Sequence, residues 1–264
     1  MKCVCNHCGQ KFEAEPQKQA ANHHLFVGDS TRAADVAKAM AGHKAALFAT
    51  DPPFLVDYTG NDRPNASGKD WSAIYREIDI RDAEVFLSAV FTNAVSVCHD
   101  NAAWYCWHAH KRVALIEAIW ERLGVLNHQQ IVWVKPTAVH TYSFWPWRHE
   151  PCLMGWKQGH KPNHDGENSH ALTSVWEVDW DGASRPVGYA HPTSKPPEIF
   201  RRPMRKHTKP GDVCYEPFSG SGTQLVAAEQ TGRLCLAIEI SPAFAAVALE
   251  RLAALGLNPR LADA

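Results

Sequence analysis

A glycine-rich turn followed by an acid is the first group of residues that could do chemistry. The stretch Glu216–Thr223 (EPFSGSGT) lies between an expected strand and an expected helix, and Glu239 ends the next strand, 17 residues after Gly222. Glycines let the backbone turn sharply and approach a ligand, and an acid at the tip of the second strand can accept both hydroxyls of a ribose. The pattern indicates a nucleoside site, with an ordinary tight turn as the alternative.

The turn lacks the third glycine of a dinucleotide-binding fingerprint. Leu225 stands where G-x-G-x-x-G has its last glycine, so a pyrophosphate would find no fully open cradle. An adenosyl ligand without phosphates fits this pattern better.

The second group is the tetrapeptide Asp51-Pro52-Pro53-Phe54, which follows an apolar strand. Asp51 is therefore expected at the carboxyl end of that strand, where α/β sheets bind ligands. The prolines carry no N–H and restrict φ, so their carbonyls are rigid acceptors beside a carboxylate and an aromatic ring. This set suits a planar exocyclic amine, because Asp51 and the Pro52 carbonyl can accept its two N–H groups while Phe54 stacks on the ring. A plain turn at the strand end is the alternative.

The third group is the segment 191–197, which reads HPTSKPP. Ser194 and Lys195 offer hydroxyl, backbone and ammonium donors that could hold a carboxylate. The alternative is a proline-rich entry into a helix with a solvated lysine.

The cysteines near the N-terminus could form half of a zinc ribbon. Cys5 and Cys8 have the C-x2-C spacing of a zinc knuckle, but a closed structural site needs four ligands. Candidates for the others are Cys3, His7, His23 and His24. A zinc ion bound by Cys5 and Cys8 and an ion-free, reduced tail both stay open.

Short β-like runs alternate with helical periodicity after residue 22, which is typical of a mostly parallel sheet in an α/β fold. Strands are expected at 25–27, 45–49, 103–107, 130–134, 151–156, 213–215 and 234–238. Helices are expected at 31–40, 82–97, 111–123, 198–207, 223–231 and 242–255. Residues 136–192 otherwise show little periodicity and are expected to form long loops.

Composition and charge limit the partners. With 264 residues, 45% hydrophobic and 21% charged, the chain is expected to fold, and its net charge of -1 means that a polyanion must be held by a local patch. An apolar signal core and a membrane span are absent from the sequence, so a cytoplasmic location is expected. Five of the eight cysteines lie singly in apolar runs and are expected to be buried and reduced: Cys98, Cys106, Cys152, Cys214 and Cys235.

Together the three groups resemble the amino DNA methyltransferases, whose tetrapeptide is D/N/S-P-P-Y/F/W, over nearly all of residues 25–251. The tetrapeptide precedes HPTSKP and the glycine turn, an order similar to that of the permuted beta group. Further matches are 27–29, 56–60, 131–135, 149–151 and 175–176. The resemblance implies a Rossmann-like class I methyltransferase fold, with 1–22 as a small appendage and 23–264 as the catalytic domain.

The resemblance also implies S-adenosylmethionine as the cofactor and in-line methyl transfer to a neutral amine of a flipped-out base. Residues assigned to the cofactor are Asp29, Asp51, Ser194, Lys195, Phe218, Ser219, Gly220, Ser221, Gly222, Thr223 and Glu239. Residues assigned to catalysis are Asp51, Pro52, Pro53 and Phe54. Aspartate in the first position of the tetrapeptide is the family's usual signature for adenine N6, and serine for cytosine N4. We therefore expect N6-adenine methylation of double-stranded DNA, with cytosine N4 as the alternative.

Three segments are candidates for DNA contact. The polar stretch 58–71 is expected to be a mobile loop that orders on DNA, or a solvated connection. Residues 137–189 are the expected target-recognition region, because amide and guanidinium groups occur there among aromatics. Basic residues of an expected helix either contact phosphates or form a solvated face: Arg201, Arg202, Arg205 and Lys206.

The resemblance further implies a homodimer of bacterial or phage origin, and leaves a cognate restriction nuclease undetermined. Two other classes of function stay open. One is an enzyme that uses the same tetrapeptide on RNA or a protein amide, and the other is a DNA-binding protein without turnover.

Overall fold

The computed structural model describes residues 2–4, 11–13, 23–54, 82–139, 144–163, 172–179 and 195–260. The strands are β1 (Lys2–Val4), β2 (Lys11–Glu13), β3 (His24–Val27), β4 (Ala45–Thr50), β5 (Cys98–Trp107), β6 (Val125–Val139), β7 (Trp147–Lys157), β8 (Val175–Glu177), β9 (Val213–Glu216) and β10 (Leu234–Glu239). The helices are α1 (Ala33–Met40), α3 (Ala83–Val97), η1 (His110–Arg112), α4 (Val113–Arg122), α5 (Glu198–His207), α6 (Thr223–Thr231) and α7 (Pro242–Ala254).

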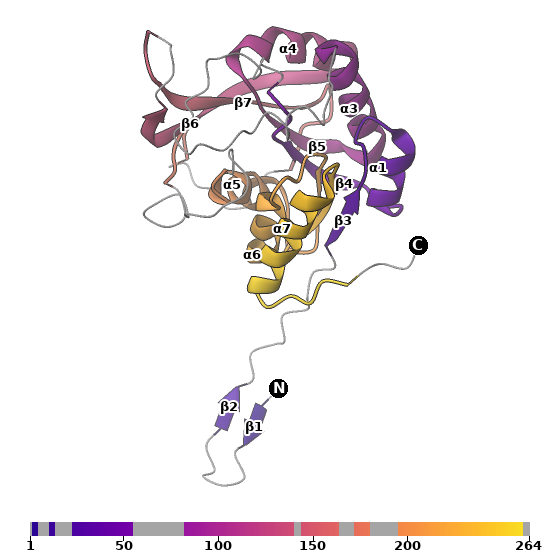
Figure 1. Ribbon diagram of the computed structural model, residues 1–264, viewed down its shortest axis with the longest axis vertical. Coiled ribbons are helices and arrows are strands. Elements are labelled where there is room, and N and C mark those ends of the chain that lie inside the picture. The colour runs from indigo at the N-terminus through magenta and orange to yellow at the C-terminus, as the bar shows by residue number, and fades with distance from the viewer. Residues whose placement is uncertain are drawn as a thin grey trace.

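A sheet with the strand order β3-β10-β9-β4-β5-β7-β6-β8 forms the centre of the described chain (Figure 1). Within this sheet β7 runs antiparallel to its neighbours β5 and β6, and the other pairs are parallel. The parallel register, which pairs Val27 with Glu239 and Thr50 with Cys106, places the carboxyl ends of neighbouring strands at one edge. The expected α/β fold with a mostly parallel sheet is confirmed.

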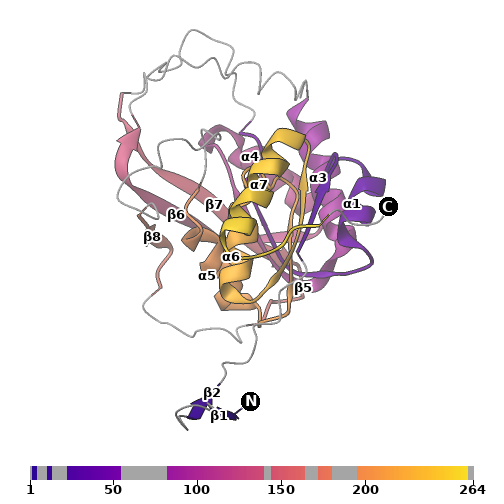
Figure 2. The ribbon, with the colours of Figure 1, turned by 60° about the horizontal axis from the view of Figure 1, so that its bottom comes forward.

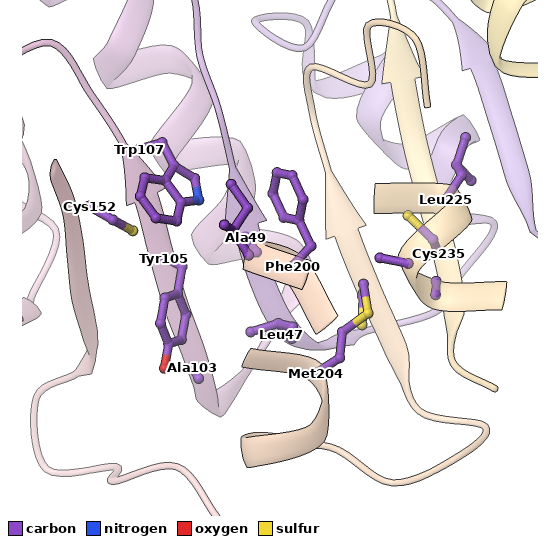
Figure 3. Packing of buried hydrophobic residues seen from close by; sticks show 14 of the residues in the cluster. Leu47, Ala49, Ala103, Tyr105, Trp107, Cys152, Phe200, Met204, Leu225 and Cys235 are labelled. Carbon is purple, nitrogen blue, oxygen red and sulfur yellow. The ribbon is translucent and has the colours of Figure 1, made fainter. Parts of the chain in front are cut away.

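Helices cover both faces of the sheet (Figure 2). Helices α5, α6 and α7 pack on one face, where Leu47, Ala49 and Trp107 point (Figure 3), and α1, α3 and α4 pack on the other. The intervening residues point to that second face, where the rings of Phe48 and Trp104 lie 4.5 Å apart. Because successive side chains of a strand alternate between faces, the buried runs of β4 and β5 fill two cores at once.

The hairpin of β6 and β7 is longer than the sequence predicts. Strand β6 extends from Val125 to Val139 and pairs with β7 from Lys157 to Trp147. The prediction of loops from residue 136 onward is therefore wrong for the ends of these strands and for the short strand β8. Apolar and polar residues do not alternate cleanly in these segments, so the side-chain pattern does not predict strands there. Backbone hydrogen bonds between β6 and β7 nevertheless extend both strands.

The burial of five cysteines and the bounds of two helices agree with the sequence predictions. All five cysteines expected in the core are buried and carry free thiols. Both helices 198–207 and 223–231 have the bounds that were expected. Among the described helices, none combines the length and the apolar character needed to cross a membrane.

Gly222 precedes α6 at a point where no other residue fits. Its φ of +78° lies in the left-handed region, and a Cβ at this position would lie 2.7 Å from the Cβ of Ala248 in α7. Both the backbone conformation and the contact between α6 and α7 therefore require glycine.

We predict that Gly222→Ala lowers the free energy of unfolding by about 3 kcal/mol, the sum of left-handed strain and overpacking. Urea unfolding followed by circular dichroism measures this change. Gly42→Ala is the matched control, because Gly42 has a φ of +80° and no atom within 4 Å of the added Cβ. Equal losses in the two variants would contradict the packing argument.

Candidate functional site at the carboxyl edge of the sheet

Four acidic side chains gather at the carboxyl edge of adjacent strands. Asp29 follows β3, Glu239 ends β10, Glu216 ends β9, and Asp51 follows β4, in the order in which these strands lie in the sheet. The strand interiors are apolar because both faces are covered, so polar side chains first occur where the strands end. This edge is therefore the candidate site.

The turn Pro217–Gly222 is held against β10. The amide of Ser219 donates to the carbonyl of Ile238 at 2.8 Å. Gly220 has a φ of +51°, and its N–H donates to Oε2 of Glu239 at 2.7 Å. The glycine turn and the acid at the end of the next strand thus lie in direct contact.

Glu239 is buried, and both of its carboxylate oxygens accept hydrogen bonds. Its Oε1 accepts from the amide of Ser241 at 2.9 Å, while Oε2 accepts from Gly220. Each carboxylate oxygen has a second acceptor position, so the side chain can still accept two hydroxyls of a ligand. Burial raises the pKa of Glu239, and the backbone amides of Ser241, Gly220 and Ile240 act against that rise.

Phe218 and Ser219 lie beside this acid, and only the side chain of Phe218 has a partner among the described residues. The ring of Phe218 lies 5.7 Å from the ring of Phe86 in α3. The hydroxyl of Ser219 is buried, and no group in the described part of the chain hydrogen bonds to it. A buried hydroxyl without a partner is costly, which favours a polar ligand atom at this position.

The turn is also held by Arg251 of α7. Arg251 donates through Nη1 to the carbonyl of Ser221 at 2.7 Å and to its Oγ at 3.1 Å. The same nitrogen lies 3.2 Å from Oγ1 of Thr223, the first residue of α6. Arg251 therefore ties the turn and the start of α6 to α7.

Asp29 sits next to Glu239 across β3 and β10. The amide of Gly28 donates to the carbonyl of Glu239 at 3.0 Å. One oxygen of Asp29, Oδ1, accepts from the amide of Thr31 at 2.9 Å and from its hydroxyl at 2.7 Å. These bonds hold the carboxylate in place at the end of β3.

Asp51 is held by one strong interaction. Its Oδ2 accepts from Nζ of Lys195 at 2.6 Å, and the two side chains are 21% and 4% exposed. Its other oxygen, Oδ1, is buried and has no donor among the described residues. Burial raises the pKa of Asp51, and the positive charge of Lys195 opposes the rise. Asp51 therefore has one occupied and one unsatisfied acceptor oxygen.

The other residues of the tetrapeptide surround this pair. Pro52 is buried, and Pro53 and Phe54 are partly buried. The centroid of the Phe54 ring lies 4.9 Å from Nζ of Lys195, within range of a cation–π interaction. The ring and the carboxylate thus both lie close to one ammonium group.

Two charged residues that the sequence analysis did not assign to the site complete this group. Nζ of Lys195 lies 3.0 Å from Oε2 of Glu150 in β7, and Oε1 of Glu150 lies 2.5 Å from Nζ of Lys135 in β6. Burial opposes ionisation, but the charges of Lys195 and Lys135 lower the pKa of Glu150 to about 2. The stretches 131–135 and 149–151 were matched to the family, but only the pairing of β6 with β7 brings their charges to Lys195.

Glu216 was quoted with the glycine turn but not assigned a role. Its Oε1 accepts from the amide of Phe218 at 2.9 Å and from the hydroxyl of Thr50 at 3.1 Å. With the amide of Gln224 oriented toward these acceptors, its nitrogen donates to Oε2 of Glu216 at 2.9 Å and to the carbonyl of Ala49 at 2.8 Å. Burial, with a contribution from Asp51, raises the pKa of Glu216 to about 8. The sequence feature that could have assigned Glu216 to the site is its position as an acid at the end of a buried strand.

Several predicted positions lie outside the described residues. Ser194, the zinc candidates Cys5 and Cys8, and the segment 58–71 belong to these positions, as does part of the region 137–189. Within the described residues, no three His, Cys, Asp or Glu side chains cluster in a way that could hold a metal ion. The zinc prediction therefore stays untested.

The basic helix α5 carries its own counter-charge. Glu198 pairs with Arg201 at 2.8 Å, with Arg202 at 3.3 Å and with Arg205 at 2.6 Å. A phosphate contact by these guanidinium groups would compete with Glu198. The phosphate-binding interpretation of this helix remains a prediction.

Comparison with known proteins identifies the family. The chain belongs to the N6/N4 DNA methylase family, whose sequence pattern matches residues 45–250. The type II methyltransferase M2.DpnII of Streptococcus pneumoniae is 39% identical over 223 residues, which cover 79% of this chain and 82% of that protein. The type II methyltransferase M.XycI of Xanthomonas campestris pv. cyanopsidis is 31% identical over 140 residues, 49% of this chain and 45% of that protein. The match thus spans about half the length of M.XycI.

Solved structures show the same fold. The M1.HpyAVI–SAM complex aligns with a TM-score of 0.63 and 18% identity, covering 86% of this chain and 98% of that one. The PvuII DNA methyltransferase, described as cytosine-N4-specific, aligns with a TM-score of 0.64 and 15% identity, covering 92% and 89%. The fold is that of the class I methyltransferases.

We predict that Glu216 makes stability fall with rising pH. Its pKa is 4.5 when unfolded and about 8 when folded, so the folded state binds the extra proton and loses stability as pH rises between these values. As pH rises across this window, the free energy of unfolding of Glu216→Gln should therefore increase relative to that of the wild type. Urea unfolding at a series of pH values measures both, with the exposed Glu121→Gln as control. Parallel curves for wild type and Glu216→Gln would contradict the assignment.

Proposed function

We propose that this chain is an S-adenosylmethionine-dependent methyltransferase that modifies the exocyclic N6 of adenine in double-stranded DNA. One observation carries the proposal. The Asp51-Pro-Pro-Phe54 group, with a buried and unsatisfied carboxylate oxygen, lies at the same edge as the glycine turn and Glu239. An amine acceptor and a nucleoside acceptor at adjacent strand ends are the two halves of a methyl-transfer site.

The residues of this edge fit S-adenosylmethionine. Glu239 retains acceptor positions for the two ribose hydroxyls, and the unsatisfied Ser219 hydroxyl offers a further contact. The N-terminal end of α6, which begins at Thr223, is favourable to a carboxylate. Asp29 lies on the adenine side in the assignment from the family. The cofactor supplies a methyl group on a sulfonium ion.

Asp51 is the residue of this chain that binds the reacting amine and stabilises the charge that develops on it. The exocyclic amine of an extruded base donates one N–H to Asp51 and the other to the Pro52 carbonyl, and Phe54 stacks on the base. As the nitrogen attacks, positive charge develops on it, and the carboxylate stabilises that charge in a largely dry site. Positioning and charge stabilisation therefore suffice without a covalent intermediate.

The choice of adenine over cytosine rests on Asp51 as the first residue of the tetrapeptide. The fold does not discriminate between adenine and cytosine, because the PvuII enzyme, described as cytosine-N4-specific, also has this fold. Cytosine N4 is therefore the alternative that the experiment must exclude.

The β6–β7 hairpin supports a duplex as the substrate. Trp107, the last residue of β5, pairs with Cys152, so 147–151 of β7 continue about 15 Å past the end of β5. This extension lies at the edge that carries Asp51. Beyond it, Phe144 and Trp145 are 101% and 86% exposed.

Basic and aromatic side chains accompany this extension. The ring of His110 stacks on Trp147 at 4.8 Å, next to the basic residues Lys111 and Arg112 of η1. The exposed Arg148 donates to the carbonyl of Lys135 at 3.1 Å. Cations that meet phosphates beside exposed rings that stack on bases are typical of nucleic-acid surfaces, and they give the local patch that the net charge lacks. A homodimer, also implied by the family, is part of the same proposal.

We predict that Asp51→Ala lowers the methylation rate about 10²- to 10³-fold while cofactor affinity stays within a few-fold, because the carboxylate acts on the amine. Nucleoside mass spectrometry of plasmid DNA from a methylation-deficient host measures the product, and calorimetry measures cofactor binding. Asp100→Ala, at an exposed ion pair with Lys157, is the control. N6-methyladenine with the wild type supports the proposal, N4-methylcytosine overturns the base assignment, and full activity of Asp51→Ala overturns the mechanism.

We predict that the double variant Phe144→Ala, Trp145→Ala weakens duplex binding about tenfold or more, since stacking of a base on an aromatic ring contributes roughly 1–3 kcal/mol. Fluorescence anisotropy with a labelled duplex measures this at several salt concentrations. Val85→Ala, which removes an exposed apolar side chain from α3, is the control. Equal affinity of both variants would exclude the hairpin end from the DNA surface.

A further inference from the structure

Four alternating charges form a continuous chain across the site, here called the charge chain: Lys135, Glu150, Lys195 and Asp51. Nitrogen–oxygen distances along it are 2.5 Å, 3.0 Å and 2.6 Å. It runs from Lys135 in β6 and Glu150 in β7 to Lys195, three residues before α5, and ends at Asp51, the residue after β4. Asp51 and Glu150, which are far apart in sequence, thus meet at the ammonium group of Lys195.

The charge chain is largely removed from water. Its side chains are 13%, 17%, 4% and 21% exposed, in order from Lys135 to Asp51. Taking four charges out of water is costly, and replacing such a group by apolar side chains often leaves stability unchanged or raises it. Stability alone therefore does not account for the arrangement. The charge chain ends at Asp51, whose Oδ1 has no donor among the described residues, and this indicates a role in the reaction.

We propose that Glu150 is a positioning residue for methyl transfer, which shares the Lys195 ammonium with Asp51 so that Asp51 keeps a net negative charge toward the target amine. Lys135 holds Glu150 in place from the other side. This inference rests on the proposed function and assigns Glu150 and Lys135 a part in it.

Charge balance explains why the sharing matters. Asp51 and Lys195 alone form a neutral pair, which is a poor stabiliser of positive charge developing on nitrogen. With Glu150 on the same ammonium, the charge of Lys195 is divided between two carboxylates, so less of it acts on Asp51. The bond from Lys195 to Oδ2 also fixes the plane of the Asp51 carboxylate and leaves Oδ1 for the amine. Lys135, at the far end of the charge chain, compensates Glu150, and its charge lowers the pKa of Asp51 less than that of Lys195 does.

The charges around Asp51 predict opposite effects for its two neighbours. Among the described residues, the titratable groups that interact electrostatically with Asp51 are Lys195 before α5, Glu150 of β7, Lys135 of β6, Glu216 of β9, and the thiols of Cys106 and Cys152. Glu150 raises the pKa of Asp51 and Lys195 lowers it. Removing Glu150 should therefore lower that pKa, and removing Lys195 should raise it.

The test is the pH dependence of kcat for DNA methylation in wild type, Glu150→Gln and Lys195→Met. Since Asp51 must be ionised, the acid limb should move to lower pH in Glu150→Gln and to higher pH in Lys195→Met. At the plateau Glu150→Gln should lose about tenfold in kcat with the KM for the cofactor unchanged, as expected for a misplaced catalytic group. A purely structural role would lower activity in both variants without opposite shifts, and that result would overturn the proposal.

Two further measurements keep the test decisive. Glu150→Gln leaves two lysines with one carboxylate, so the double variant Lys135→Met, Glu150→Gln restores charge balance if the single one folds poorly. Its acid limb should move in the same direction but less far, because Lys135 also lowers the pKa of Asp51. The ¹⁵N–¹H signal of the Lys195 ammonium, identified by its loss in Lys195→Met, should shift in Glu150→Gln and Asp51→Asn but not in Asp100→Asn. An unmoved signal in Glu150→Gln overturns the sharing. Absence of methylation by the wild type would instead overturn the proposed function, while the ammonium signal still decides whether Glu150 shares Lys195.

Discussion

Burial of the central strands on both faces is the constraint on which the rest of this structure depends. Strands β4, β9 and β10 lie between two helical layers, so nearly every side chain in them is buried and apolar. Polar groups are tolerated only where a strand ends and its side chains meet turns, amides or charges. Asp51, Glu216 and Glu239 occupy those ends, and parallel direction brings them to one edge. The apolar interior thereby determines where chemistry can take place.

The acids at this edge differ because their partners differ. Glu239 is satisfied by two backbone amides, and Glu216 faces neutral donors, with burial raising its pKa to about 8. Glu150 has two ammonium partners, and its pKa is about 2. Asp51 lies between these cases, with one ammonium partner and one unsatisfied oxygen. Environments that separate the properties of neighbouring carboxyl groups are typical of functional sites.

The β6–β7 hairpin links this edge to the outside of the molecule. Its inner part is a sheet component that contributes Trp133 and Cys152 to the core, and its outer part passes the end of β5 (Figure 1). Glu150 sits where the two parts meet, paired in register with Trp133 and in contact with Lys195. A hairpin that binds DNA at its end would therefore be joined rigidly to the charges around Asp51. The proposed DNA contact and the proposed positioning residue Glu150 therefore lie on one element.

The sequence by itself determined the order of the described α-helices and of all the described strands except β1, β2 and β8. It also determined the glycine turn with Glu239 and the tetrapeptide at a strand end, because these depend on local periodicity and on residues adjacent in the chain. It also determined the family, since many short motifs occur in one order. Tertiary structure alone decided that Lys195 meets Asp51, that Glu150 and Lys135 join them, and that β6 and β7 extend each other. These contacts connect residues up to 144 positions apart through strand register and helix packing, which leave no periodic trace in the chain. Charges brought together by register are thus invisible to any pattern read along the sequence.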